Sequence, residues 1–278
     1  MKRFMAHALI FDSGVGGLSV AAEIRRMLPL LRLSYIADDA FRPYGEKSEA
    51  ALRARLPRLL SELCLMLDPD IVVIACNTAS TTALPAIRDA LSVPVVGVVP
   101  AIKPAAAKSR TKTIGVLGTP GTVRRKYVDE LIHEFASDCH VILQGSVNLV
   151  DQAEAKLSGQ AVNMDIIRGE LSAMFSGRKG MDLDAVVLAC THFPLLREEL
   201  KASVTQSVFW IDSGEAVAKR VKAVLSSLTD VTRLSPPQQD TAFLIGPNAS
   251  PARAQAFAKF GFKRVVGLMP DKMPIGKI

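Results

Sequence analysis

Short apolar segments alternate with longer amphipathic segments along the whole chain. The apolar segments are rich in Val, Ile and Leu and lack the every-second-residue polarity of a strand with one exposed face. This pattern is typical of strands that are buried on both faces of a parallel sheet. The predicted strands span residues 8–11, 33–37, 71–75, 95–99, 113–117, 141–143, 185–189 and 208–211. Helical periodicity predicts helices over residues 48–66, 79–91, 123–135 and 214–226.

This alternation of strands and helices predicts an α/β fold with parallel sheets. At ~150 residues per domain, the 278 residues are enough for about two domains. An internal repeat indicates two related halves. Residues 71–78 and residues 185–192 each consist of an apolar strand, the dipeptide Ala-Cys and then polar residues, and each is followed by a predicted helix. A second echo relates residues 12–14 to residues 212–214, which are both Asp-Ser-Gly.

Composition narrows the class of protein. Hydrophobic residues make up 49% of the chain and charged residues 22%, as in a globular protein. The net charge is +7, but the basic residues are scattered and aromatic residues are only 5%, so we expect no nucleic-acid partner. We expect no membrane span, since no apolar run approaches ~20 residues. The four cysteines are widely spaced, which favours a reducing cytoplasm over a zinc site or a disulfide framework.

Two of the cysteines follow predicted strands in matching contexts. Cys76 and Cys190 lie at the carboxyl ends of their strands, where parallel α/β sheets bind ligands. The following helices are expected to begin near residues 78–80 and near Pro194, and a helix N-terminus favours the thiolate form of a cysteine. A single cysteine in such a place is often only a buried apolar residue. The matching pair therefore favours a chemical role for both.

Two loops rich in glycine and hydroxyl groups also follow strands. The first, Asp-Ser-Gly-Val-Gly-Gly at residues 12–17, leaves backbone N–H groups available to an anion. Its spacing is not that of a dinucleotide-binding loop, and an Asx-turn at Asp12 is the simpler alternative. The second, Gly-Thr-Pro-Gly-Thr at residues 118–122, is also compatible with an ordinary helix cap.

The remaining candidates are single positions. His192 is two residues from the second strand-end cysteine and could orient its thiol, although a lone histidine is usually structural. Pro-Tyr-Gly at residues 43–45 could line a pocket or form a plain turn. Cys64 lies in an apolar helix stripe and Cys139 lies between a helix and a strand, so both are predicted to be structural.

Taken together, these motifs resemble the glutamate racemases, the pyridoxal-independent amino acid racemases of bacterial cell-wall synthesis. The matching motifs keep the order and spacing of that family over nearly the whole chain; they are residues 12–17, 43–45, 75–79, 118–119 with 122, and 189–194. The sequence Cys-Thr-His-Phe-Pro at residues 190–194 fits glutamate racemases better than their aspartate-specific relatives. An aspartate or hydantoin racemase and a non-catalytic amino-acid-binding protein remain as alternatives.

The resemblance implies two α/β domains related by pseudo-twofold symmetry, with the active site between them. The first domain would comprise residues 1–98 and 209–278, and the second would comprise residues 99–208. The family also implies a cytoplasmic homodimer that needs no cofactor and no metal, and that supplies D-glutamate for peptidoglycan synthesis. A peptidoglycan precursor is a candidate activator.

The family's residue roles carry over to matching positions. By this resemblance Cys76 deprotonates D-glutamate and Cys190 deprotonates L-glutamate, while Asp12, His192 and Glu154 assist proton transfer. The substrate-binding residues implied in the same way are Asp12, Ser13, Tyr44, Gly45, Asn77, Thr78, Thr119, Thr122, Thr191 and His192.

Overall fold

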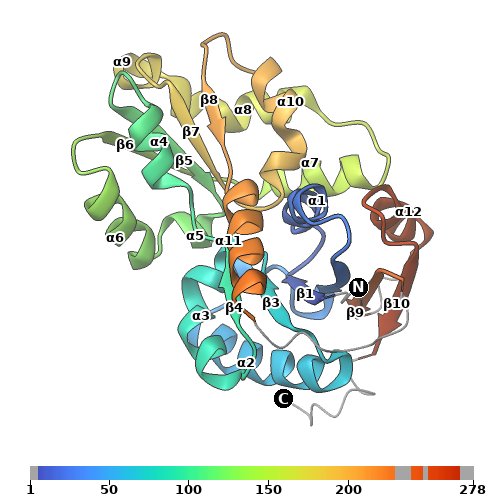
Figure 1. Ribbon diagram of the computed structural model, residues 1–278. Helices are drawn as coiled ribbons and strands as arrows, with labels where there is room; N and C mark the ends of the chain where they lie inside the picture. The colour runs from blue at the N-terminus through green and yellow to red at the C-terminus, as the bar shows by residue number, and fades with distance from the viewer. Residues whose placement is uncertain (1–5, 229–238, 247–249, 270–278) are drawn as a thin grey trace. The chain divides into compact units, whose positions relative to one another are not determined.

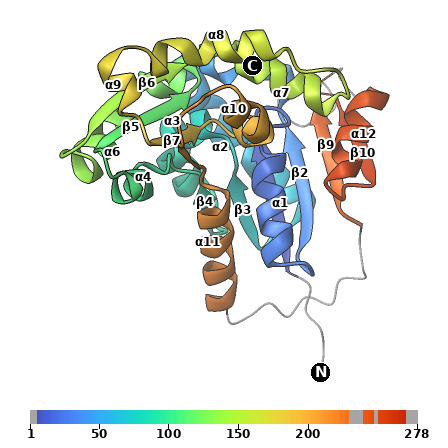
Figure 2. The same cartoon turned by 90° about the horizontal axis from the view of Figure 1, so that it is seen from above.

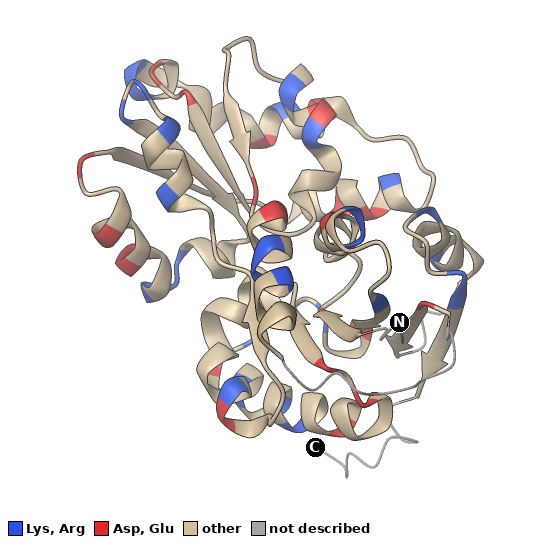
Figure 3. Ribbon diagram, viewed as in Figure 1, with Lys and Arg blue, Asp and Glu red and all other residues tan. Residues whose placement is uncertain are grey.

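The computed structural model describes residues 6–228, 239–246 and 250–269. The chain divides into two compact units, Met1–Val98 with Gly214–Ile278, and Val99–Ser213 (Figure 1). Each unit contains one sheet, and all strand pairs in both sheets are parallel. Lys, Arg, Asp and Glu are interspersed along the helices (Figure 3). None of the helices within these described ranges is long and apolar enough to span a membrane.

The first unit has a six-stranded sheet in the order β10-β9-β2-β1-β3-β4. Its strands are β1 (His7–Asp12), β2 (Arg32–Ala37), β3 (Ile71–Ile74), β4 (Val95–Gly97), β9 (Thr241–Ile245) and β10 (Arg264–Leu268). Its helical segments are α1 (Leu18–Met27), η1 (Asp39–Phe41), η2 (Tyr44–Glu46), α2 (Glu49–Leu67), α3 (Asn77–Ala90), α11 (Gly214–Ser227) and α12 (Pro251–Lys259).

Helices cover both faces of this sheet, so its central strands are mostly apolar. Helix α1 packs beside α11, and α2 packs beside α3 (Figure 2). Leu9 and Phe11 of β1 belong to the same apolar cluster as the buried residues of α2 and α3. Side chains alternate along a strand, so Ala8 and Ile10 face the opposite way, and they are also fully buried.

The second unit has a four-stranded sheet in the order β6-β5-β7-β8. Its strands are β5 (Thr113–Gly118), β6 (His140–Gly145), β7 (Ala185–Ala189) and β8 (Phe209–Ile211). Its helical segments are α4 (Ile102–Lys108), α5 (Pro120–Val123), α6 (Lys126–Phe135), α7 (Asn148–Leu157), α8 (Met164–Phe175), α9 (Gly177–Met181), η3 (Phe193–Leu196) and α10 (Arg197–Ala202). Separate apolar clusters lie against its two faces.

The two sheets share one topology. When the strands are numbered in chain order, the spatial order β2-β1-β3-β4 in the first sheet matches β6-β5-β7-β8 in the second sheet. Strand β1 therefore corresponds to β5, and β3 corresponds to β7. The repeat of residues 71–78 in residues 185–192 therefore reflects equivalent strands. The echo between residues 12–14 and residues 212–214 does not, because Asp212 follows β8, the counterpart of β4. By topology, the counterpart of Asp12 is Gly118 at the end of β5.

The predicted strands and helices are all present, with three differences. Strands β9 and β10 were not expected; β10 is a sheet edge whose residues are only partly buried. Pro194 lies in the 3₁₀ turn η3, which begins at Phe193, and the α-helix starts only at Arg197. The chain returns to the first unit at residue 214 instead of residue 209, because β8 pairs with β7 in the second sheet.

Candidate active site

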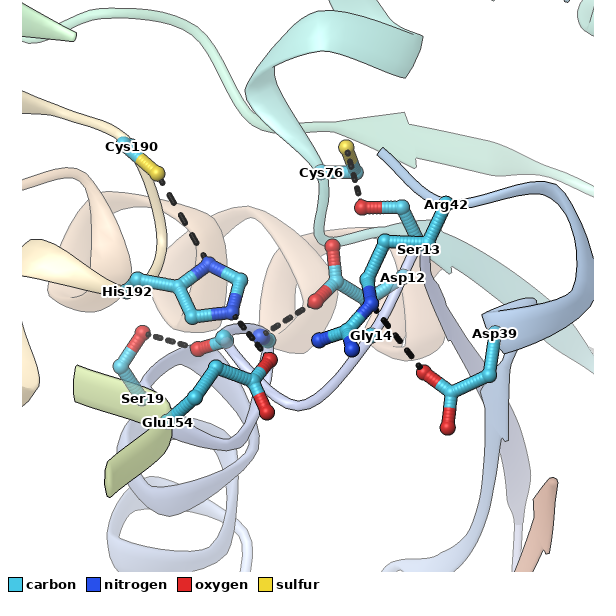
Figure 4. A network of polar contacts seen from close by, with 12 residues as sticks. Asp12, Ser13, Gly14, Ser19, Asp39, Arg42, Cys76, Glu154, Cys190 and His192 are labelled. Carbon is cyan, nitrogen blue, oxygen red and sulfur yellow. Dashed lines mark hydrogen bonds and ion pairs between the residues drawn. The ribbon is translucent and has the colours of Figure 1, made fainter. Parts of the chain in front are cut away.

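In the first unit, Cys76 lies where the strand order reverses. Strands β1 and β3 are neighbours in the sheet. From β1 the chain continues to β2 on one side, and from β3 it continues to β4 on the other side. Ligands bind to α/β sheets at such a switch point. Their register, continued by two residues, places Ser13 beside Cys76. The Ser13 Oγ and Cys76 Sγ atoms are 3.5 Å apart (Figure 4). Cys76 is buried and occupies the N-cap position of α3.

Asp12, at the end of β1, has one carboxylate oxygen engaged by the protein and one that is not. Its Oδ2 atom accepts a hydrogen bond from the Gly17 backbone N–H at 2.9 Å, which closes the glycine loop before α1. This contact spans five residues and is not an Asx-turn, which would engage the N–H two residues on. Tyr35 donates its hydroxyl to the Gly14 carbonyl at 3.0 Å and so braces the same loop. Within the described ranges, Oδ1 of Asp12 and Oδ1 of Asn77 are buried without a hydrogen-bond partner. Two buried acceptors suit a ligand that carries N–H donors.

The Pro-Tyr-Gly loop is held by a buried ion pair that the sequence did not reveal. Tyr44 donates its hydroxyl to Asp38 Oδ2 at 2.6 Å, and Arg55 donates Nε and Nη2 to the two Asp38 oxygens, each at 2.8 Å. Burial, the Asp38 carboxylate and the nearby Cys76 all raise the pKa of Tyr44 well above its usual value of 10. Tyr44 was expected to contact substrate, but its hydroxyl is directed at Asp38. The adjacent Gly45 is half-buried in η2.

A second aspartate ties the same loop to the C-terminal part of the unit. Asp39 forms an ion pair with Arg253 of α12 at 3.2 Å. It forms a longer ion pair with Arg42 at 3.9 Å (Figure 4). The Asp39 side chain is fully buried. The segment that carries α12 therefore contributes to the loop that follows β2.

In the second unit, a hydrogen-bonded chain runs from Cys190 through His192 to Glu154. Cys190 follows β7 as Cys76 follows β3. Its Sγ atom lies 3.8 Å from His192 Nδ1, and His192 Nε2 lies 3.0 Å from Glu154 Oε1 (Figure 4). Cys190 and His192 are buried, while Glu154 projects from α7 and has a side chain that is 18% exposed.

These contacts keep the imidazole of His192 charged. Burial alone lowers the pKa of His192, but Cys190 and Glu154 outweigh that effect and raise it from 6.5 to about 10. At neutral pH the imidazolium therefore donates Nε2–H to Glu154 and Nδ1–H to the sulfur of Cys190. A cation beside the sulfur stabilises a thiolate.

Hydroxyl groups line the carboxyl edges of both sheets. Thr119 is the N-cap of α5, where its Oγ1 accepts from the Thr122 backbone N–H at 3.2 Å and lies 2.9 Å from Thr122 Oγ1. The register of β5 and β7, continued by one residue, places Thr119 beside Cys190, as Ser13 lies beside Cys76. Thr78 and Thr191, which follow the two cysteines, are both buried.

The other two cysteines lie elsewhere, as predicted. Cys64 is half-buried in α2, and burial raises its pKa to about 11. Cys139 precedes β6, and burial together with Asp138 raises its pKa. Both therefore remain thiols at neutral pH.

Comparison with known proteins identifies the family. The chain belongs to the Asp/Glu/hydantoin racemase family, whose model matches residues 19–221. It is 53% identical to the glutamate racemase of Shewanella sp. (strain ANA-3) over 219 residues, which cover 78% of each chain. It is 42% identical to the glutamate racemase of Shewanella loihica over 271 residues, which cover 98% of this chain and 99% of that one.

The fold is also that of solved glutamate racemases. The crystal structure of Escherichia coli glutamate racemase in complex with L-glutamate and the activator UDP-MurNAc-Ala superimposes with a TM-score of 0.88 at 40% identity, covering 95% of this chain and 98% of that one. An isoform from Bacillus anthracis gives a TM-score of 0.78 at 28% identity, covering 96% and 98%.

Proposed function

We propose that this protein interconverts L- and D-glutamate without a cofactor, using Cys76 and Cys190 as the two acid/base groups. The observation that carries the proposal is the equivalent placement of the two buried cysteines, each within two residues of the end of the third strand of a repeated sheet topology. A racemase needs one proton acceptor and one proton donor for the two faces of the same carbon. A duplicated fold supplies two such groups from one structural element.

In each turnover one thiolate removes the Cα proton and the opposite thiol returns a proton. The electron pair of the broken Cα–H bond stays on the substrate as a carbanion, and that pair forms the new Cα–H bond on the other face. The thiolate becomes a thiol and the thiol becomes a thiolate, so the next turnover from the same side requires exchange with solvent. We assign deprotonation of D-glutamate to Cys76 and of L-glutamate to Cys190. The mechanism requires both sulfurs to reach one Cα from its two sides.

The second unit supports Cys190 as a base. The His192 imidazolium, held by Glu154 at 3.0 Å, presents a positive charge to the sulfur and stabilises its thiolate. When Cys190 acts as an acid, its thiol becomes a thiolate, and the His192–Glu154 pair stabilises that negative charge. His192 and Glu154 are therefore assigned to proton transfer at the Cys190 sulfur.

The first unit supports binding of the amino group. The unpartnered Oδ1 atoms of Asp12 and Asn77 suit the N–H groups of an ammonium, and the charge of Asp12 favours it. Donors around the α-carboxylate must also stabilise the carbanion, since no cofactor withdraws its charge in this mechanism. Tyr44 would contribute its ring and backbone, because its hydroxyl is bonded to Asp38. The proposed contacts to the amino and carboxylate groups come from Asp12, Ser13, Tyr44, Gly45, Asn77, Thr78, Thr119, Thr122, Thr191 and His192.

Glutamate is the proposed substrate because the relatives that cover nearly the whole chain are glutamate racemases, one of them crystallised with L-glutamate. We further propose that the protein is a cytoplasmic homodimer that supplies D-glutamate for peptidoglycan. The activator bound in the Escherichia coli structure makes UDP-MurNAc-Ala the activator to test here. We propose that the two units form the two domains of the enzyme, with the catalytic cysteine of each contributing to one reaction.

Exchange of the Cα hydrogen in heavy water tests the reaction. The wild-type protein should incorporate solvent deuterium into both enantiomers of glutamate while racemising them, as followed by circular dichroism and mass spectrometry. Cys76→Ala and Cys190→Ala should each abolish racemisation, whereas the matched controls Cys64→Ala and Cys139→Ala should retain it. Full racemisation by either of the first two variants would exclude the two-thiol mechanism.

The same assay separates the alternatives. Turnover of aspartate or of a hydantoin in place of glutamate would identify another activity within the family. Stabilisation by glutamate without any deuterium at Cα would identify a binding protein.

A further inference from the structure

Helix α7 carries Glu154, and a neighbouring lysine on the same helix makes contacts that the proposed mechanism has not used. Lys156 Nζ lies 2.7 Å from Glu199 Oε1 and donates to the Leu195 carbonyl at 2.8 Å. Glu199 belongs to α10, and Leu195 belongs to the η3 turn. The ammonium of Lys156 thus fastens α7 to the segment that directly follows the second catalytic cysteine.

Glu154 and Lys156 flank the buried side of α7. Leu149, Ala153 and Leu157 form its buried stripe at intervals of four residues. Each residue turns the helix by about 100°, so Glu154 lies about 100° to one side of this stripe and Lys156 about 100° to the other. Contacts from two side chains on opposite flanks fix the rotation of a helix about its axis. A single contact would leave that rotation free.

Both contacts of α7 end on one short piece of chain. Residues 190–199 contain His192, which meets Glu154, and also Leu195 and Glu199, which meet Lys156. This piece is internally braced, because Phe193 N–H donates to the Cys190 carbonyl and Leu195 N–H donates to the His192 carbonyl, each at 3.1 Å. A displacement of α7 at Lys156 therefore changes the distance between Glu154 and His192.

We propose that Lys156 and Glu199 are positioning residues that hold Glu154 against His192 and thereby keep Cys190 competent for proton transfer. This inference rests on the proposed role of Cys190 as one of two acid/base thiols. Neither residue of the pair touches the reacting atoms. Their effect is confined to the proton-transfer step at Cys190 and leaves the step at Cys76 intact.

The first experiment uses kinetic isotope effects with the variant Lys156→Met. Enantiomers have an equilibrium constant of one, so kcat/KM must fall equally in the two directions, and we expect about a tenfold fall from the displaced carboxylate. The direction-specific readout is the primary isotope effect on kcat/KM with α-deuterated substrates. A slower step at Cys190 raises this effect for L-glutamate, which Cys190 deprotonates, and lowers it for D-glutamate.

Three controls separate positioning from a general loss of structure. Lys156→Arg keeps a cation within reach of Glu199 and should restore kcat/KM to within about threefold of wild type. Lys201→Met removes a similar lysine–glutamate pair, Lys201 with Glu198 at 2.9 Å within α10, and should change neither rate nor isotope effects. Adding Lys156→Met to a Glu154→Gln variant should cause little further loss, because the lysine acts through that carboxylate.

The second experiment does not depend on turnover. Alkylation by iodoacetamide at pH 7, followed for each cysteine-containing peptide by mass spectrometry, should be several-fold slower at Cys190 in Lys156→Met, with Cys76 unchanged. Isotope effects that stay constant or move in the same direction for both enantiomers, or unchanged alkylation of Cys190, would overturn the positioning role. If racemisation itself were absent from the wild type, the alkylation rates would still test the contact between α7 and the Cys190 segment.

Discussion

Replacing Glu154 with Gln removes one of the two partners that keep the buried imidazole of His192 charged. The side chain of Gln is similar in size and can still accept a hydrogen bond from Nε2, which lies 3.0 Å from Glu154 Oε1. The substitution therefore removes the negative charge while leaving the geometry nearly intact. We expect the pKa of His192 to fall.

The magnitude follows from the contacts of His192. Burial opposes the charge, and Cys190 and Glu154 together still raise the pKa from 6.5 to about 10, a net preference for the imidazolium of roughly 5 kcal/mol. An opposite charge at this distance shifts a pKa by roughly 1–3 pH units, so Glu154→Gln and Cys190→Ser should each lower it by about that amount. The double variant should titrate at or below 6.5, because only burial then remains.

Nuclear magnetic resonance measures this pKa directly. The chain contains only four histidines, so their ring Cε1–H signals can be followed from pH 4 to pH 11 and assigned with a His192→Asn variant. Because the folded pKa lies above the unfolded value, stabilisation by the ion pair is fully present below pH 6.5 and is lost as the pH rises through about 10. The destabilisation by Glu154→Gln should accordingly be larger at pH 6 than at pH 10.5. A wild-type midpoint between 6 and 7, or a midpoint unmoved by both substitutions, would refute the assignment of charge at this site.

Two further predictions concern the first unit. His7 is buried, and its pKa is lowered to about 4, first by burial and then by the charge of a neighbouring arginine. The protein is therefore most stable above pH 6.5 and loses about 3 kcal/mol of unfolding free energy as the pH falls through 4. Urea denaturation of His7→Gln should show little of this loss. A Cβ at Gly17 would lie 2.8 Å from Tyr35 Oη and 2.9 Å from Asp12 Cβ. Gly17→Ala should therefore cost about 1–3 kcal/mol and at least tenfold in racemase activity, whereas Gly169→Ala, whose Cβ meets nothing within 4 Å, should increase thermal stability in a melting assay.

The apolar pattern was sufficient to predict the core of the fold. Strands such as β3 and β7 are buried on both faces and are therefore apolar at every position, which together with their short length distinguishes them from helices even in a single sequence. Strand β10 lacks this signal because it is an edge strand with mixed exposure. The predicted return to the first domain at residue 209 differs from the return at residue 214, because strand pairing assigns β8 to the second sheet and no local pattern reports which sheet a strand joins.

The two candidate catalytic cysteines could also be predicted from the sequence, but the charged residues that hold the surrounding loops in place could not. Cys76 and Cys190 stand out because parallel strands bring their carboxyl ends to one edge. The arginines and the lysine that brace the loops carry no comparable signal, since their partners lie far away in the chain. Arg253 meets Asp39 across 214 residues, and Lys156 meets Glu199 across 43. The position of Asp39, close after a strand end, was the available hint.

The equivalence of the two cysteines is topological, while their surroundings differ. Cys190 has an imidazolium and a carboxylate behind it, whereas Cys76 has the hydroxyl of Ser13 at 3.5 Å. Thermodynamics allows this asymmetry, because an equilibrium constant of one fixes only the ratio of kcat/KM in the two directions. Different thiol environments can still give different kcat values for L- and D-glutamate, provided that the KM values differ by the same factor. The duplicated fold therefore provides matched positions for two proton-transfer groups, and the unmatched residues around them determine how each proton transfer contributes to the rate.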